Sequence, residues 1–335
     1  MNNLKKLGLS ALAGSLVAFS ANAGELSVSG SAEFTYTDND GTTGSGNEIT
    51  GNPFGAQQTI AFTGSGDVGF GELTVVRSLN DGGTANSTSY ATLDMGSIGT
   101  LSFDSNGWGG VGYGANDDVL PTAYEEIWTG SSGTSGISGA GSSNTLGYAN
   151  SFGPLNFSIG YQKNGASANQ AESVASGAGV TGSTTDMYVS AAVPGIDGLT
   201  VGFGHAEKTQ NTVETNDADT TSTGMNINYS AGPVAVGYRM AEINTGTADT
   251  GSSVIDAWSI AFNVNENMAI SYGQQDTERE AVADTASVTE EVTGINASYT
   301  VGAASIRFLN SKSENDGFAA GTEKEHTEIG VVLSF

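Results

Sequence analysis

The sequence predicts an all-β fold, namely a transmembrane, antiparallel, up-and-down β-barrel of 16 strands in a single domain. Three observations favour this fold. Many short segments alternate between apolar and small or polar residues, the connections between them alternate between short and long, and the last segment keeps its alternation to the final residue.

The first observation is alternation with a period of two. Leu155, Phe157, Ile159 and Tyr161 share one parity, for example, and a strand sends residues of one parity to one face. Alternation between turn signals is the pattern of a strand. Sixteen segments are therefore expected to be strands: 25–38, 56–66, 69–80, 87–95, 99–105, 144–152, 154–164, 184–193, 199–208, 222–230, 233–243, 254–264, 268–277, 291–300, 303–311 and 326–335.

The second observation is the order of the connections. Seven are short turns, and they alternate with eight longer polar segments, at 39–55, 81–86, 106–143, 165–183, 209–221, 244–253, 278–290 and 312–325. A soluble sandwich has turns of both kinds at both ends, whereas an up-and-down membrane barrel has short turns on one rim and long loops on the other. This order places both termini on the short-turn side.

The third observation is the segment from His326 to Phe335. Apart from Val332, its apolar residues share one parity, down to the terminal aromatic, and Thr327 shares it too: Thr327, Ile329, Val331, Leu333 and Phe335. Soluble sheets usually end in a frayed polar tail. The pattern indicates the closing strand of a barrel.

The N-terminal segment has the features of a secretory signal peptide. Lys5 and Lys6 precede an apolar stretch from Leu7 to Phe19, and Ala21-Asn22-Ala23 forms a small-residue cleavage site. The apolar stretch is too short for a spanning helix. We expect residues 1–23 to be removed and the barrel to comprise 24–335.

Composition excludes several classes of function. The chain has 36 acidic and 10 basic residues, and without Lys5 and Lys6 the balance is 36 against 8, or −28. Such a surface disfavours nucleic acid as a partner. The absence of cysteine excludes disulfides, metal thiolates and a cysteine nucleophile. The acidic segments are expected to be solvated loops or an outward crown that binds divalent cations: 38–48, 214–219, 276–291 and 314–325.

Together, the signal peptide, the strand count, the alternation of loops and the terminal Phe335 resemble the sixteen-stranded general porins of Gram-negative outer membranes, most closely those of alphaproteobacteria. The resemblance covers 24–335. It implies a homotrimer in outer-membrane lipid, a water-filled channel for ions and small hydrophilic solutes, and a C-terminal aromatic that the assembly machinery reads. It also implies that the third long loop folds into the barrel and narrows it.

The third long loop, 106–143, is unlike the others. Its segment 116–128 carries apolar residues that should pack on a surface, together with four acids. Long loops inside compact folds are usually functional or disordered. We expect this segment to form the constriction, with the following site residues: Asp117, Asp118, Tyr124, Glu125, Glu126 and Trp128.

In the porins that this chain resembles, basic residues on the wall face the acidic loop. Arg239 and Arg307 alternate against apolar residues and should point into the lumen. Arg77 is ambiguous, because Leu73 and Val75 share its parity; we expect it inward or near a rim, since an arginine in lipid costs about 2–4 kcal/mol at the midplane. Few bases and many acids predict a preference for cations.

Other functions remain open alternatives. An outer-membrane hydrolase would need a histidine acid or base, and the only two histidines, His205 and His326, lie within expected strands. A barrel with a plugged lumen, serving a structural or display role, is the other alternative. No catalytic residue, metal site or cofactor is expected, apart from weak loop-bound calcium at Asp38–Gly41 or Glu314–Gly317, where the glycine departs from the EF-hand spacing.

Overall fold

The computed structural model describes nine ranges of the chain: 24–41, 51–80, 88–106, 111–133, 144–163, 182–209, 219–245, 251–280 and 287–335. The signal peptide expected over 1–23 lies outside the described residues. So do parts of the expected long loops and acidic segments, at 42–50, 81–87, 107–110, 134–143, 164–181, 210–218, 246–250 and 281–286.

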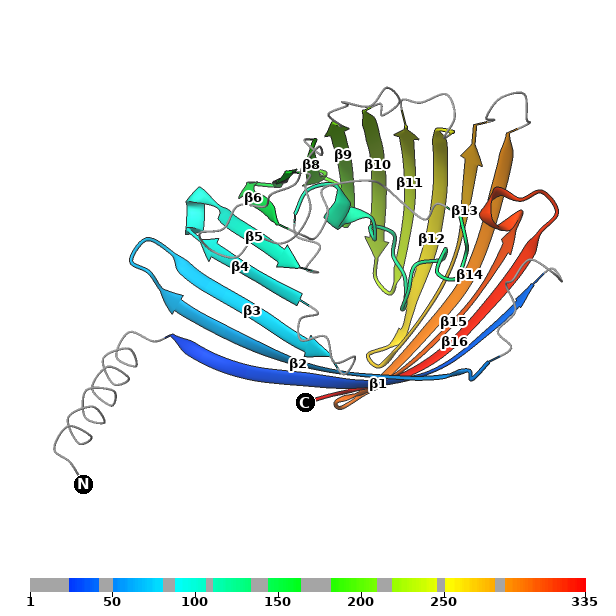
Figure 1. Ribbon diagram of the computed structural model, residues 1–335, viewed down its shortest axis with the longest axis horizontal. Coiled ribbons are helices and arrows are strands. Elements are labelled where there is room, and N and C mark those ends of the chain that lie inside the picture. The colour runs from blue at the N-terminus through cyan, green and yellow to red at the C-terminus, as the bar shows by residue number, and fades with distance from the viewer. Residues whose placement is uncertain are drawn as a thin grey trace.

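Within these ranges, sixteen strands form one closed barrel in which sequence neighbours pair antiparallel and β1 pairs with β16 (Figure 1). The predicted fold class is confirmed. The strands are β1 (Glu25–Gly41), β2 (Phe54–Asp67), β3 (Glu72–Asn80), β4 (Thr88–Asp94), β5 (Thr100–Asn106), β6 (Thr145–Phe152), β7 (Leu155–Lys163), β8 (Ser183–Ala192), β9 (Leu199–Thr209), β10 (Thr220–Ala231), β11 (Val234–Asn244), β12 (Ser253–Asn265), β13 (Met268–Arg279), β14 (Val288–Val301), β15 (Ala304–Glu314) and β16 (Glu323–Ser334). Three single turns of 3-10 helix complete the described elements: η1 (Gly96–Ile98), η2 (Gly114–Asn116) and η3 (Asp316–Phe318).

The outer face of the barrel is apolar because of the alternation within each strand. In β12, Trp258, Ile260 and Phe262 are 39–41% exposed, whereas Ala257 and Ser259, which have the opposite parity, are buried. An apolar outer face is what lipid requires of a membrane barrel. Among the described residues, no helix is long and apolar enough to cross a membrane.

Several strands extend up to three residues beyond the expected ends, on the side of the long loops. Strand β14 begins at Val288 rather than 291, and β15 ends at Glu314 rather than 311. Hydrogen-bonded pairing continues there among polar residues, which a pattern of apolar alternation does not mark.

The barrel closes at the C-terminus. The amide of Phe335 donates to the carbonyl of Gly30 over 2.9 Å, and the amide of Gly30 donates to the carbonyl of Phe335 over 2.8 Å. The last residue of the chain therefore belongs to the seam between β1 and β16.

Candidate functional site

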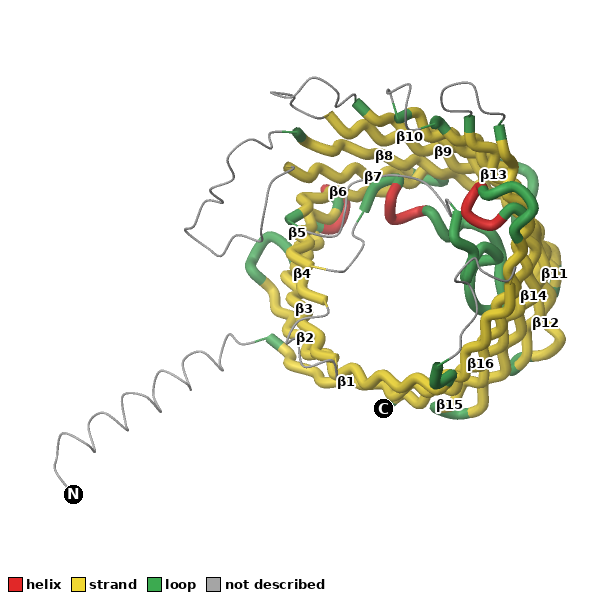
Figure 2. The backbone as a smooth tube through the Cα atoms, turned by 45° about the vertical axis from the view of Figure 1, so that its right-hand side comes forward, coloured by secondary structure: helices red, strands yellow, loops and turns green. Residues whose placement is uncertain are grey.

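The segment 111–133 lies inside the barrel along the inner wall, on the side of β11 to β14 (Figure 2). It is held by side chains that reach inward from six consecutive strands, β10 to β15. These side chains bond mostly to backbone groups of the loop, so its path does not depend on the loop's own charged side chains. The bonds are Asn228 Nδ2 to Val119 O (2.8 Å), Arg239 Nη1 to Asp117 O (2.6 Å), Ser259 Oγ to Pro121 O (2.7 Å), Ala123 N to Ser271 Oγ (2.9 Å), Asn296 Nδ2 to Glu125 O (3.0 Å) and Ser311 Oγ to Thr129 O (2.6 Å).

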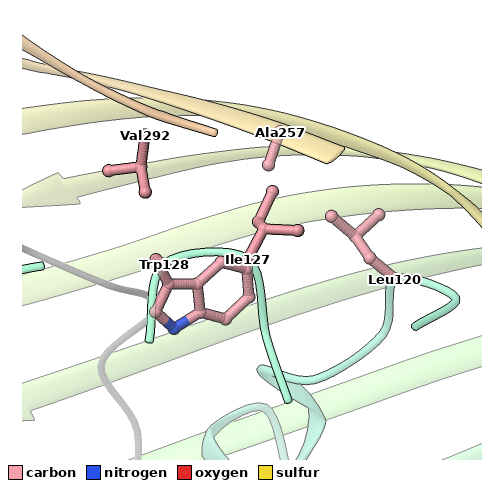
Figure 3. Close-up of a cluster of buried hydrophobic side chains, with 5 residues drawn as sticks. All are labelled: Leu120, Ile127, Trp128, Ala257 and Val292. Carbon is pink, nitrogen blue, oxygen red and sulfur yellow. The ribbon is translucent and has the colours of Figure 1, made fainter. Parts of the chain in front are cut away.

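The apolar side chains of the loop face the wall. Leu120, Ile127 and Trp128 form a buried cluster with Ala257 of β12 and Val292 of β14 (Figure 3). Ile127 is only 1% exposed. This burial gives the loop its own small hydrophobic core, which the hydrogen bonds alone would not supply.

Glycines on the inner face make room for the loop. The ring of Tyr113 lies against Gly204 of β9 and Gly224 of β10, and a Cβ atom added at either glycine would come within 1.9 Å of a Tyr113 side-chain atom. A larger residue at these positions would push the ring away from the wall. The small inward-facing residues of these strands thus form the seat of the loop.

The acidic side chains of the loop face the interior. Asp117 and Asp118 are exposed, and Glu125 and Glu126 are half-buried. Asp118 keeps an exposed surface, but its surroundings partly desolvate the carboxyl, and this desolvation, followed by the negative charges of Glu126 and Asp117, raises the pKa of Asp118 to about 6. Burial and the charge of Glu126 raise the pKa of Glu125 to about 7. The acids crowd one another on one side of the interior.

Arg239 lies on the inner face of β11 but is covered by the loop. It is 1% exposed, its guanidinium carbon lies 4.4 Å from the centre of the Trp128 ring, and Nη2 donates to Gln275 Oε1 over 2.8 Å. Together with the bond to Asp117 O, these contacts make Arg239 part of the wall surface that holds the loop. Its charge is therefore covered from the barrel interior.

Arg307 lies on the inner face of β15, between acids and the loop. Its Nη1 is 3.9 Å from Glu33 Oε1 of β1, and its guanidinium carbon is 5.1 Å from the centre of the Tyr124 ring. Tyr124 Oη in turn donates to Glu328 Oε1 of β16 over 2.6 Å. The positive charge of Arg307 therefore stands beside two carboxylates.

Of the two positions expected for Arg77, inward or near a rim, the inward one is wrong. Arg77 shares the parity of Leu73, Val75 and Leu79, which are 37–47% exposed on the outer face of β3, and its partner on β2 is Phe62. Ser78, of the opposite parity, is 7% exposed. The expectation failed because β3 carries apolar residues on both parities, Val76 among them, so that sequence alternation did not decide its faces.

Sequence reasoning missed two inward carboxylates and one anchor of the loop. Glu33 and Glu328 were not singled out, although the parity of each strand identifies its inward side. The anchor is the bond from Ser132 N to Asp316 Oδ1, 2.8 Å long, which ties the end of the described loop segment to the η3 turn. No sequence signal links residues so far apart in the chain.

The two histidines lie on different faces of the wall: His205 has the outward parity of β9, whereas His326 has the inward parity of β16 and lies 3.8 Å from Glu328 Oε2. His205 contacts Thr223 Oγ1 over 2.8 Å, and His326 contacts Asn39 Oδ1 over 2.5 Å. At Asp38–Gly41, successive side chains alternate between the two faces of β1, so they do not converge on one point. Among the described residues, no group of three or more metal-ligating side chains is present.

The family model for the Gram-negative porins matches residues 8–333. The chain therefore belongs to the Gram-negative porin family. No curated protein matches the sequence.

Solved porin structures share the fold. A porin refined at 1.8 Å resolution is 16% identical with a TM-score of 0.65, over 93% of this chain and 100% of that chain. OmpF of Salmonella typhi, in complex with daunomycin, is 14% identical with a TM-score of 0.66, over 94% and 99%. An anion-selective porin from Comamonas acidovorans is 12% identical with a TM-score of 0.65, over 93% and 99%. At these identities the likeness establishes the fold and not the ion preference.

The protein is thus an outer-membrane porin that crosses the membrane with β-strands. Family and fold support a channel rather than an enzyme.

Proposed function

We propose that this porin is a cation-preferring channel for the passive diffusion of ions and small hydrophilic solutes, and that the loop segment 116–128 sets its narrowest section. One observation carries the proposal. The acids of the loop are exposed or half-buried inside the barrel, whereas the positive charge of each arginine considered from the sequence is removed or offset: Arg77 lies outside, Arg239 lies beneath the loop, and Arg307, whose side chain is 35% exposed on the inner face, stands beside Glu33 and Glu328.

The electrostatic consequence is a surplus of negative charge along the path of the solute. Carboxylates that line a pore concentrate cations and repel anions. The electrostatic energy between an uncompensated charge and an ion is larger in a narrow, partly buried channel than in bulk water. Because Arg239 is covered, the balance between loop acids and accessible bases is more acidic than a count of four acids against three arginines suggests.

The experiment is a reversal-potential measurement in a potassium chloride gradient across a planar bilayer. We expect a cation-selective potential for the wild type and a shift toward anions in the variant D117N/D118N/E125Q/E126Q, more strongly at low salt. A wild-type channel that prefers anions would contradict the proposal.

The proposed constriction is tested separately by removing residues 116–128. Single-channel conductance should rise, because the segment occupies space inside the wall.

The competing function, a plugged barrel with a structural role, predicts no ion conductance in the wild type. Unchanged conductance after the deletion would show that another part of the chain limits the current.

We also propose that the porin is a homotrimer. Arg77 and Gln58 bring polar groups to the outer face of β3 and β2, where lipid would leave them without partners. Ala32 of β1, a small residue with the outward parity of Phe34, lies on the same side of the barrel. A partner subunit covering this wall would relieve the cost of an arginine in lipid, about 2–4 kcal/mol at the midplane. The mass of the detergent-solubilised protein, measured by light scattering, tests the stoichiometry.

The export signal is a further part of the proposed function. Residues 1–23 would direct the chain out of the cytoplasm and be cleaved after Ala23. N-terminal sequencing of the protein from outer membranes should start at Gly24; any other start would place the cleavage site elsewhere.

A further inference from the structure

A recess of about 470 Å³ opens on the inner wall below the start of the loop, near the short-turn rim. Its sides are the inner faces of β5 to β8, and Asn116 of η2 borders it on the loop side. Its size falls within the range of about 300–1,000 Å³ of small-molecule sites.

The recess is neutral. Its lining includes the side chains of Thr100, Asn116, Asn156, Ser158, Tyr188 and Ser190, and no residue of the described chain that lines it carries a charge at neutral pH. The adjoining recess along β3 to β6, by contrast, includes Glu72 and Asp94. In so acidic a protein, the neutral lining distinguishes this recess from the adjoining one.

Hydrogen bonds within the lining hold its polar side chains in place. They leave other donor and acceptor atoms of these side chains available to a ligand. Asn156 Oδ1 accepts from Ser151 Oγ over 2.7 Å, so the Asn156 amide can still donate through Nδ2. Asn116 Nδ2 donates to Gly112 O over 2.6 Å, so its Oδ1 can still accept. Ser158 Oγ accepts from Gly112 N over 3.1 Å and retains its own proton to donate.

Tyr188 adds a fixed aromatic ring to this polar set. Its Oη donates to Asn226 Oδ1 over 2.8 Å, and the residue is only 9% exposed, so the ring is held by its surroundings. A ring fixed in this way offers part of an apolar surface beside the amide and hydroxyl groups. Little conformational entropy is lost when a ligand meets groups that are already ordered.

The chemistry of the lining selects one class of ligand. An anion finds no positive charge in it, a cation finds no carboxylate, and an apolar ligand would displace water from polar groups such as the exposed Asn156 without replacing its hydrogen bonds. A sugar matches the lining, because its hydroxyl groups both donate and accept hydrogen bonds and its C–H groups can lie against an aromatic ring. We propose that this recess is a binding subsite for neutral saccharides of one or two rings. The inference rests on the proposed channel, since the subsite would act on solutes that pass the loop.

Two measurements on the full-length mature protein test the subsite. In planar bilayers, D-glucose and maltose should produce reversible, saturable noise in the potassium current, whereas the zwitterion glycine betaine should not. In detergent, the same sugars should show saturation-transfer NMR signals from the protein, a readout that requires no conduction. The failure of the proposed channel would therefore appear as absent current while the NMR signals remain.

The variants are Asn156→Leu, which removes the free amide donor, and Ser190→Phe, which fills the recess. Both should leave the potassium conductance in the absence of sugar close to that of the wild type. Asn156→Leu should weaken sugar binding about fivefold to tenfold, as expected for one hydrogen bond, and Ser190→Phe should abolish it.

The matched control is Gln57→Leu, the same type of amide-to-aliphatic change on the inner face of β2, away from the recess. It should retain the sugar signals. Wild-type protein without sugar signals in the NMR measurement, or an equal loss in Gln57→Leu and Asn156→Leu, would overturn the proposal.

Discussion

At the scale of single residues, Arg239 connects the wall to the loop. Its contacts reach Asp117, Trp128 and Gln275, and each needs the planar guanidinium. Arg239→Ala should lower the free energy of unfolding by about 2–3 kcal/mol, the size expected when hydrogen bonds to a charged group are lost. It should also increase open-channel noise, because the loop loses an anchor. Thermal unfolding and single-channel recording check both effects, and Arg77→Ala, on the outer face, serves as the control for the noise. A quiet Arg239→Ala channel would show that the other anchors suffice.

The loop acids make selectivity depend on pH. The pKa of Glu125 is raised to about 7 and that of Asp118 to about 6, so these carboxyls lose their negative charge as the pH falls through those values. Ordinary carboxyls keep their charge until about pH 4. The ratio of cation to anion permeability should therefore fall between pH 8 and pH 5, as reversal potentials would record. In the variant D118N/E125Q the ratio should start lower and stay level across this range. A wild-type ratio that stays constant down to pH 5 would contradict the assignment.

At the scale of the strands, a row of carboxylates crosses the outer face near the long-loop rim. Five acids on adjacent strands pair directly with one another in the register: Asp256, Asp276, Glu291, Glu314 and Glu323. Tyr238 donates to Asp256, Gln274 donates to Asp276, and Lys312 bridges Glu314 and Glu323. Glu291 stands in the middle, opposite a carboxylate on each side. The row is thus least compensated at its centre.

Glu291→Gln should therefore stabilise the barrel. Like charges directly opposite on paired strands are destabilising, and removing the central one should gain about 0.5–1 kcal/mol. Tm should rise at low ionic strength, and the gain should shrink in 1 M salt, where the Debye length is about 3 Å. Glu323→Gln is the control, because Glu323 lies 3.8 Å from Lys312 Nζ; that substitution should bring no gain. Equal effects of the two substitutions would mean that total charge matters rather than the register.

At the scale of the whole molecule, the barrel depends on the seam between β1 and β16. Deleting Phe335 removes both of its backbone hydrogen bonds to Gly30. We expect the shortened chain to refold less completely in detergent and to unfold at a lower temperature, which the heat-dependent shift of the folded band on gels would report. Phe335→Leu keeps the backbone bonds and should refold nearly as well as the wild type. If the deletion refolds normally, the remaining pairs of the seam are sufficient.

The sequence predicted the barrel better than the site. Strand number and order followed from alternation and turn spacing, because the outer face must be apolar along every strand. The parity of β11 predicts that Arg239 lies on its inner face. It does not predict that the Trp128 ring covers Arg239, because the docking of a loop depends on the shapes of the contacting surfaces and not on a sequence period. Arg77 was misplaced because an apolar residue on each side of a strand leaves parity undecided. Glu33 approaches Arg307 only because the barrel closes, which brings β1 beside β16.

The way the loop is held also has a consequence for the order of events in assembly. Among the described residues, the loop segment 111–133 precedes in the chain the side chains that hold it, from Ser158 of β7 to Glu328 of β16. When the loop leaves the ribosome, none of its anchors has yet been made. Its final position has to wait until β10 to β15 lie side by side, so the interior of this pore acquires its working shape late, after most of the wall has formed.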